Sequence, residues 1–502
     1  MEIFWGNPLT IEIKGLDILG VRGIDQAIEE KLVNGITTIS LRARYYSILT
    51  WAIGSFLQAG ITPTGTGTFT DSAFRAFLRR VEFLCLACTA LDDLNSGRLN
   101  GVLGRDLFDA ELKELWANEV VEFPDNARTA MFLTYYGPCR AVGLLKDAPG
   151  SVVPGQLTPL GRELMELRER AMPAGILVLL SGKASLDLKS VKDAKASFSL
   201  HSSSIPSDER ELLLKALGTP RSGRTADDHR RFVSSVEWII AELKREPTSA
   251  EWLLSRNYAA RVSQGATDDV ADSWAEYEWQ RRCHFAFEWL LASFCDALNR
   301  QGDLSLAEAV EWLIRSASDS LDQMAEIVGL SELAPATPST TLLRAIPDDY
   351  QLAAPLPTRS MSSQRGGVGA LGAVCLLAAL YRQSKELRRR KIFKSPDPVA
   401  HRAMAAFERC ADLSSAQLLE ALVLQCAIVP HLTTTLRKMG GGQQCSLRFF
   451  PDGELFRSTA VQVAAGRSGT RLANVLGVLS DLSVLELTED AYLPGKVTFH
   501  EA

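Results

Sequence analysis

Residues 470–482 read TRLANVLGVLSDL, and residues 484–499 read VLELTEDAYLPGKVTF. The apolar residues of the first stretch recur at helical spacing and predict an amphipathic helix. In the second stretch, residues 484–487 predict a strand, 488–490 a turn and 491–499 a returning strand. A helix followed by such a hairpin is typical of a winged-helix module, so we expect one near the C-terminus, within residues 400–502.

The same order of elements is found earlier in the chain. Residues 127–144 predict a helix, and a short strand is expected to begin at Leu145. A turn-rich stretch follows, and residues 156–157 predict the returning strand. Residues 158–159 then place threonine at the N-cap and proline at the first position of another helix. We therefore expect a second winged-helix-like module near residues 70–165.

The rest of the chain is predicted to be helical over long stretches. Apolar residues at helical spacing predict helices over residues 40–58, 71–91, most of 227–330, 366–394 and 414–428. Residues 181–207 are polar and rich in serine, which predicts a long loop. The fold class that follows is mainly α, a helical bundle with winged-helix (α+β) modules.

A length of 502 residues favours two to four domains. Residues 333–367 carry five prolines and many Ser and Thr, which predicts a Pro/Ser-rich linker. We expect an N-terminal helical domain with a winged-helix-like part over residues 1–180 and a helical bundle over 181–332. A basic helical domain that ends in a winged-helix-like module is expected over 368–502.

Composition places the protein among soluble, cytoplasmic proteins. It is 46% hydrophobic and 23% charged, which is ordinary globular usage. The first residues have neither the basic nor the apolar region of a signal peptide. The longest apolar run, residues 366–381, is shorter than the roughly twenty residues that a membrane span needs, so we expect a buried helix there. The nine scattered cysteines favour reduced, buried thiols.

Positive charge is concentrated in the C-terminal part, although the net charge of the chain is −6. Residues 366–502 hold sixteen Lys and Arg against twelve Asp and Glu, and the density peaks at residues 385–394. This run could neutralise phosphates of a nucleic acid. The alternative is a solvated helix end, whose cations complement the helix dipole. The candidate residues of this run are Arg388, Arg389, Arg390, Lys391 and Lys394.

The two predicted winged helices supply further nucleic-acid candidates, because Arg and Asn suit phosphates and base edges. These are Arg467, Arg471 and Asn474 in the C-terminal module, and Arg128, Arg140 and Lys146 in the N-terminal one. Winged helices also serve as protein docking units, so a protein partner is the alternative for both modules.

Arg42 and Arg44 stand at the start of a predicted aromatic helix. Two interpretations are open for this pair. The functional one is an anion site at a helix N-terminus. The structural one is ion pairing within the domain, with Asp17 or Glu82 as the partner.

The sequence contains few signs of catalysis. The six histidines show no metal-binding spacing, and neither a phosphate-binding glycine loop nor a nucleophile elbow is present. Cys85 and Cys88 form a C-x-x-C pair without the further ligands of a zinc site, so we interpret them as core residues. Asp481, Glu486 and Lys496 loosely match a nuclease core but fall on the predicted winged helix. We expect no cofactor, no metal and a non-enzymatic role, and a divergent enzyme whose site is assembled from distant residues is the alternative.

Residues 35–46, with Trp51 after them, read Gly-Ile-Thr-Thr-Ile-Ser-Leu-Arg-Ala-Arg-Tyr-Tyr. This stretch resembles the opening motif of a bacterial family that is associated with mobile elements and phage defence, in which glycine and hydroxyl residues precede Arg-Ala-Arg-Tyr. Residues 79–82 and 101–104 resemble a second block of that family. The resemblance covers roughly residues 10–165, and the chain departs from the pattern after Gly104. It implies winged-helix content and a defence-associated role, and it carries over no catalytic residue.

Together these observations predict a non-enzymatic component of a bacterial anti-phage or mobile-element defence system. We expect it to bind nucleic acid or a protein partner of the same system through its winged-helix modules. The alternative is a two-part regulatory protein that is controlled by a partner or by proteolytic cleavage within residues 333–367.

Overall fold

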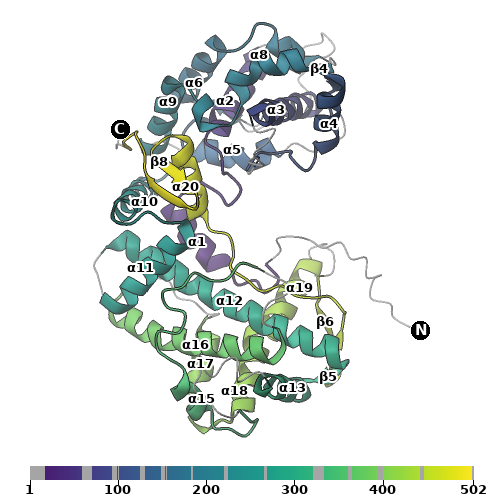
Figure 1. Ribbon diagram of the computed structural model, residues 1–502, viewed down its shortest axis with the longest axis vertical. Coiled ribbons are helices and arrows are strands. Elements are labelled where there is room, and N and C mark those ends of the chain that lie inside the picture. Colours follow the sequence, from purple (N-terminus) through teal and green to yellow (C-terminus); the bar gives the residue numbers. More distant parts are fainter. Residues whose placement is uncertain are drawn as a thin grey trace, which may run out of the picture. The chain divides into compact units, whose positions relative to one another are not determined.

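A computed structural model describes the chain in segments separated by short gaps. The described residues are 17–58, 71–92, 99, 101–124, 130–148, 153, 155–182, 185–219, 224–264, 268–319, 333–359, 365–393, 400–440 and 446–499. They form two compact units, each assembled from two stretches of sequence. Unit 1 comprises Met1–Ile28 and Glu251–Ser468, and unit 2 comprises Glu29–Ala250 and Gly469–Ala502. Both units are mainly helical, which confirms the expected mainly α class (Figure 1).

Unit 2 is built from helices with three short two-stranded sheets. Its elements are α2 (Arg44–Gln58), α3 (Asp71–Asp92), α4 (Asp109–Asn118), β1 (Val120–Glu122), α5 (Met131–Ala141), β2 (Leu145–Asp147), β3 (Gly155–Leu157), α6 (Pro159–Arg170), α7 (Ile176–Ser181), β4 (Ser185–Asp187), α8 (Leu188–Phe198), α9 (Ser207–Gly218), α10 (Ala226–Arg245), α20 (Arg471–Asp481), β8 (Leu485–Thr488) and β9 (Ala491–Pro494). The sheets pair β1 with β4, β2 with β3 and β8 with β9, all antiparallel. Helix α1 (Gly23–Leu32) contains the boundary between the units.

The core of unit 2 surrounds α2, in which all residues from Arg44 to Phe56 are buried. Trp51 contacts Phe198 of α8 edge to face, with ring centroids 5.4 Å apart. The aromatic residues that predicted this helix therefore form the centre of the unit. Each such ring removes a large apolar area from water, so burial of α2 contributes to the hydrophobic stabilisation of unit 2.

Carboxylates that are distant in sequence cap the N-termini of two helices in unit 2. Asp481 of α20 accepts a hydrogen bond from the backbone N–H of Ala43, just before α2, at 3.0 Å. Glu29 accepts one from the N–H of Arg471, the first residue of α20, at 2.7 Å. The first N–H groups of a helix have no partner within the helix, and the helix dipole favours negative charge at that end. These caps fix α20 against the segment that precedes α2.

Unit 1 is a helical bundle with one small sheet. Its elements are α11 (Ala250–Gln264), α12 (Asp269–Gln301), β5 (Leu304–Ser305), α13 (Leu306–Ser318), α15 (Ser339–Ala345), α16 (Gly366–Arg389), α17 (Ala400–Glu408), α18 (Ser415–Leu422), a π-helical segment (Val423–Ile428), α19 (Val429–Gly440), β6 (Phe449–Asp452) and β7 (Leu455–Ser458). The strands form an antiparallel sheet in the order β5-β7-β6. α11 begins at the last residue of unit 2.

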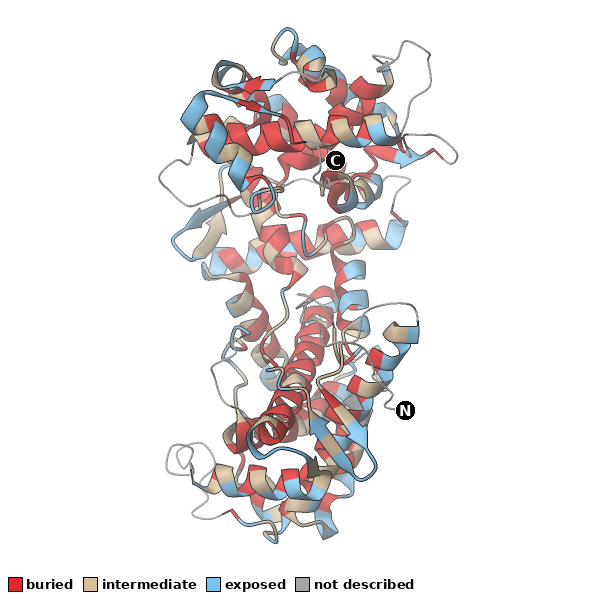
Figure 2. Ribbon diagram, turned by 90° about the vertical axis from the view of Figure 1, so that its right-hand side faces the viewer, coloured by how far each residue is buried: buried red, intermediate tan, exposed pale blue. Residues whose placement is uncertain are grey.

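Helices α12 and α16 form the centre of unit 1, and Figure 2 shows buried residues along the central helices of both units. Glycines let α16 approach its neighbours closely. A Cβ at Gly372 would lie 2.4 Å from the ring of Trp289 in α12, and one at Gly367 would lie 2.1 Å from the carbonyl oxygen of Leu313 in α13. The apolar run at 366–381 is thus a buried helix, as expected.

The residues expected to form a linker, 333–367, belong to the core of unit 1 where they are described. Leu342 of α15, Ile346 and Leu356 are buried in the main hydrophobic cluster. Ser339 N–H donates to the carbonyl of Leu413 at 3.0 Å. This corrects the linker prediction, because a few well-spaced apolar residues suffice to hold a proline-rich stretch against the bundle. The unit boundaries likewise differ from those predicted at residues 180, 332 and 367.

The predicted loop over residues 181–207 is also corrected, because it contains β4 and α8. Asp187 caps α8 by accepting a hydrogen bond from Ser190 N–H at 2.6 Å. Val191, Ala194 and Phe198 lie at helical spacing and are buried. The prediction failed because α8 is an amphipathic helix with only one narrow face in the core, so that its overall composition is polar.

Candidate interaction surface

Helix α5 begins where a buried carboxylate from α3 caps it. Glu82 accepts hydrogen bonds from the backbone N–H groups of Ala130 at 2.9 Å and Met131 at 3.0 Å. Ala130 occupies the N-cap position and offers no side-chain oxygen of its own. The orientation of α5 therefore depends on α3, because Glu82 is fully buried there.

The predicted hairpin follows α5 as expected. Leu145 pairs with Leu157 and Asp147 with Gly155. At its base, Thr158 accepts a hydrogen bond from Gly161 N–H at 3.1 Å and so caps α6, which confirms the predicted N-cap. The sequence of helix, hairpin and capped helix places β2 and β3 beside the C-terminal end of α5.

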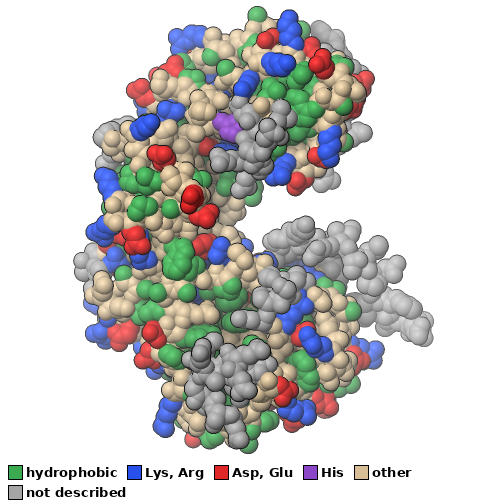
Figure 3. All heavy atoms as spheres, in the orientation of Figure 1, with side chains coloured by type: hydrophobic (Ala, Val, Ile, Leu, Met, Phe, Trp, Pro, Cys, Tyr) green, Lys and Arg blue, Asp and Glu red, His purple; other side chains and the backbone are tan. Residues whose placement is uncertain are grey.

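The outward face of α5 exposes one large apolar side chain, with two half-buried aromatic rings beside it. Leu133 is 83% exposed, and Gly137, one turn later, is exposed as well. Beside them the half-buried rings of Phe132 and Tyr136 stack with centroids 4.6 Å apart. Figure 3 shows hydrophobic side chains gathered at the surface over the part of unit 2 that holds α3. Such a face differs from a basic, polar nucleic-acid surface.

The predicted cations of this module lie in two different surroundings. Arg140, at the end of α5, forms an ion pair with Asp147 of β2 at 2.9 Å and lies over the Tyr136 ring, 5.8 Å from its centroid. Lys146 is exposed on β2. Tyr136 donates a hydrogen bond to Asp147 at 2.9 Å. Partial burial, together with the Asp147 carboxylate, raises the pKa of Tyr136 to about 12, so its phenol remains a neutral donor. Arg128 lies outside the described residues.

The C-terminal module has the predicted helix and hairpin but lacks an outward face. No residue of α20 is exposed. Asn474 is 4% exposed and donates to the carbonyl of Thr37. Arg471 places its guanidinium 3.8 Å from Glu30 and donates to the carbonyl of Ile36 at 3.4 Å. The expectation that these side chains face a nucleic acid is corrected, because Asn474 is buried and both side chains are engaged by contacts within unit 2.

Arg467, the third candidate of that module, lies in unit 1. It donates to the carbonyl of Leu356 at 2.9 Å, and its Nε lies 3.5 Å from Glu251. The guanidinium thus holds the segment before residue 468 against the bundle.

Two arginines of the basic run at the end of α16 are engaged within unit 1. Arg389 pairs with Glu386 at 2.7 Å, and Arg390 donates to the carbonyl of Arg261 in α11 at 2.9 Å. Arg388 and Lys391 are exposed. Lys394 lies outside the described residues. These contacts favour the interpretation of a helix end whose cations satisfy nearby carboxylates and carbonyls.

Arg42 and Arg44 pair within unit 2, which supports the structural interpretation but with other partners than Asp17 and Glu82. Arg42 pairs with Asp481 at 3.1 Å, and Arg44 pairs with Glu209 of α9 at 3.1 Å.

Two buried charge clusters were not found by sequence reasoning. In unit 2, Glu209 accepts from both Arg44 and Arg168, and all three are almost fully buried. Burial alone would raise the pKa of Glu209, but the two guanidinium groups outweigh it and hold that pKa below its ordinary value. The available signal was a set of arginines within apolar helical stretches, which require buried partners.

The second cluster lies on α12 in unit 1. Glu278 binds Arg281 at 3.1 Å and Arg282 at 2.9 Å, and Arg281 also binds Glu251 at 2.7 Å. All of these side chains are almost fully buried except Glu251. With its carboxylates matched by arginines, the cluster has the character of a structural network.

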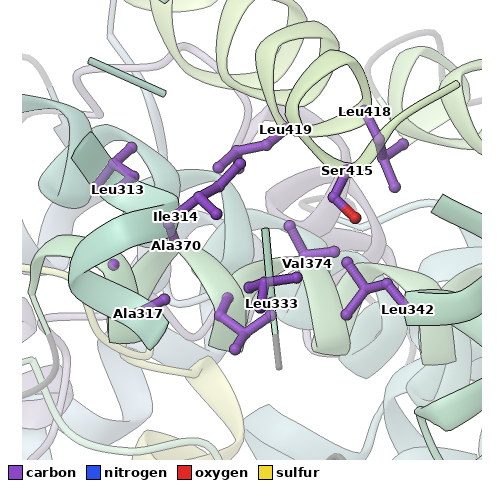
Figure 4. Close-up of a pocket in the computed structure, with 12 residues that line it drawn as sticks. Leu313, Ile314, Ala317, Leu333, Leu342, Ala370, Val374, Ser415, Leu418 and Leu419 are labelled. Carbon is purple, nitrogen blue, oxygen red and sulfur yellow. The ribbon is translucent and has the colours of Figure 1, made fainter. Parts of the chain in front are cut away.

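Unit 1 contains a small apolar cavity of about 20 Å³ between α13, α15, α16 and α18 (Figure 4). Leu313, Leu342 and Val374 line it, and Ser415 supplies its one side-chain hydroxyl. A substrate site needs several convergent polar groups, so this pocket is a packing gap of the bundle. Within the described ranges, no three His, Cys, Asp or Glu side chains are grouped as metal ligands would be.

Two described helices, Gly366–Arg389 and Ser415–Gly440, are long and apolar enough to cross a membrane when only length and composition are considered. Core helices of globular proteins pass the same test, and α16 is such a buried helix.

Comparison with family models, with curated proteins and with solved structures gives no match for this chain.

Proposed function

We propose that this protein is a non-enzymatic component of a bacterial anti-phage or mobile-element defence system that binds a partner protein through α5 and the β2–β3 hairpin. The observation that carries the proposal is the exposure of Leu133 beside the stacked rings of Phe132 and Tyr136. Aromatic residues and arginine are enriched in the cores of protein interfaces, whereas a lysine-rich surface is typical of phosphate binding.

The charge of this surface favours protein over nucleic acid. The Arg140 guanidinium is neutralised by Asp147, which leaves Lys146 as the exposed cation of the described hairpin. One cation contributes little to phosphate binding, because affinity for nucleic acid grows with the number of phosphates neutralised. A helix with a hairpin that presents an apolar face is a winged-helix-like docking module in this proposal.

The defence-associated role is supported by the resemblance around residues 35–46. The last three of those residues form the first turn of α2 and are buried, whereas Ile39 is 56% exposed, so the Arg-Ala-Arg-Tyr end of the motif bears on the fold that holds α5 in place.

A photo-crosslinking amino acid at position 133 tests the proposal in the native host. We expect a covalent adduct with one protein that is encoded near this chain. The matched control is the same amino acid at position 487, since Leu487 is 51% exposed on the other hairpin of unit 2. Leu133→Asp should abolish recovery of the partner while leaving the melting temperature unchanged.

Gel shifts against DNA and RNA at low salt form the second arm of the test. We expect that any complex with DNA or RNA is unaffected by Lys146→Glu and by the double reversal Arg388→Glu/Lys391→Glu. A salt-sensitive complex that these reversals remove, with no adduct at position 133, would replace the protein partner by a nucleic acid.

A further inference from the structure

Unit 1 presents a line of apolar side chains along one long helix. The helix runs from Ser415 to Gly440 through α18, the π-helical segment and α19. Leu424, Val429 and Leu436 are 38%, 41% and 55% exposed, and Leu432 between them is half-buried. We call these four residues the stripe. Single exposed apolar residues are ordinary, but a row along one helix face marks an interaction surface.

The π-helical segment is what aligns the stripe. Leu424 and Val429 are five residues apart, which in an α-helix separates two side chains by roughly 140° around the axis. A turn closed by hydrogen bonds between residues five apart brings them nearly into line. Leu436 then lies two turns beyond Val429 on the same face. π-segments of this kind are frequently found at functional sites.

We infer that the stripe binds a second copy of this chain, with the two helices antiparallel about a twofold axis near Val429. Equal spacing on either side of that axis makes the stripe self-complementary. Leu424 of each copy meets Leu436 of the other, and Val429 meets Leu432. A twofold interface needs this kind of self-complementary patch.

Charge complementarity supports this partner. Glu420 lies one turn before Leu424, and Arg437 directly follows Leu436. Neither side chain has an ion-pair partner among the residues that the structure describes. In the antiparallel pair Glu420 of one copy lies about three residues, or about 4.5 Å, along the axis from Arg437 of the other. A parallel pair would place like charges at the same level.

Cysteine crosslinking tests the geometry in the full chain. The described cysteines of the chain are all buried. Val429→Cys, near the axis, should form a disulfide-linked dimer readily. Leu424→Cys alone should not, because two such residues lie about 18 Å apart in the antiparallel pair. A mixture of Leu424→Cys and Leu436→Cys chains should crosslink to the mixed dimer. Crosslinking of Leu424→Cys to itself would overturn the antiparallel arrangement.

A charge-swap series measures the association itself by sedimentation velocity over roughly 1–100 µM. Glu420→Arg and Arg437→Glu should each weaken dimerisation, and the double variant should restore it. Leu436→Asp should weaken it roughly tenfold or more. Leu455→Asp is the matched control, since Leu455 is 41% exposed in the sheet of the same unit. A chain that remains monomeric over this range overturns the inference, as does a monomer that binds vesicles of phosphatidylglycerol through the stripe.

Discussion

Asp481 and Arg42 form an ion pair that fixes α20 onto the segment before α2, with Oδ1 and Nη1 3.1 Å apart. The carboxylate is almost completely buried, and its other oxygen accepts the Ala43 N–H at 3.0 Å. Burial raises the pKa of Asp481 to about 6, although Arg42 acts in the opposite direction. The cap that positions the central helix of unit 2 is therefore a group that titrates in a mildly acidic range.

This titration predicts a pH dependence of stability with a defined sign. In the unfolded chain the carboxyl has an ordinary pKa near 3.8, so the fold favours the protonated form. The stabilisation of the folded state by protonated Asp481 is present below about pH 4 and is lost as pH rises through 6. Asp481→Asn keeps an acceptor for Ala43 and has no proton to lose. We expect the melting temperature of the wild type to fall relative to this variant between pH 4.5 and pH 6.5. If the melting temperatures of the two proteins change equally with pH, the assignment to Asp481 is contradicted.

His431 predicts the opposite dependence in unit 1. Its Nδ1–H donates to the carbonyl of Ile18 and its Nε2 accepts the N–H of Arg448, both at 3.0 Å, so the neutral ring is required. Burial lowers the pKa of His431 to about 4, below its ordinary value of 6.5. Its stabilisation is complete above pH 6.5 and is lost as pH falls towards 4. His431→Gln should have a lower melting temperature than the wild type at pH 7.5, but its melting temperature should fall less on acidification in the same thermal melts. If the melting temperature of the variant falls as much as that of the wild type, another group is responsible.

Glu82→Ala should loosen α5 without changing any surface residue. The substitution removes the acceptor for the first N–H groups of the helix, and losing such a cap costs about 1–2 kcal/mol. Hydrogen exchange of the α5 amides should accelerate, and adduct formation at position 133 should fall. Glu82→Gln, which keeps one acceptor oxygen, should recover most of the protection. Unchanged exchange in the alanine variant would mean that packing alone holds α5.

Glu209→Gln should be strongly destabilising, because it leaves the guanidinium groups of Arg44 and Arg168 without their buried counter-charge. Breaking a buried pair in this way costs about 3–5 kcal/mol. The control is Asp109→Asn, which breaks a solvent-exposed pair with Lys113 and should change stability by less than about 1 kcal/mol. Urea unfolding monitored in unit 2 gives the free energy of unfolding of both variants. Similar decreases in that free energy for the two variants would contradict the prediction.

Sequence patterns predicted local structure where a hydrophobic face had a clear period. The helix around residues 40–58, both hairpins and the Thr158 cap are examples. They failed where few apolar residues carried the packing, as in residues 333–359 and in α8. In those segments the structure is determined by the surface against which the segment packs, and the composition of the segment alone does not indicate it.

The sequence predicted where the candidate surface lies, but it did not predict which of its side chains are exposed. The order of helix and hairpin indicated α5 and α20 equally. Only tertiary packing shows that α20 is enclosed while α5 exposes Leu133. The caps from Glu82, Asp481 and Glu29 join residues far apart in sequence, and no local pattern reports such pairs.

The two-segment composition of unit 2 has a consequence for how the protein is made. Residues 29–250 leave the ribosome long before residues 469–499, yet α20 and its caps complete the same unit. During synthesis residues 29–250 therefore wait for the last helix of their unit, with the site for α20 open to water and to chaperones.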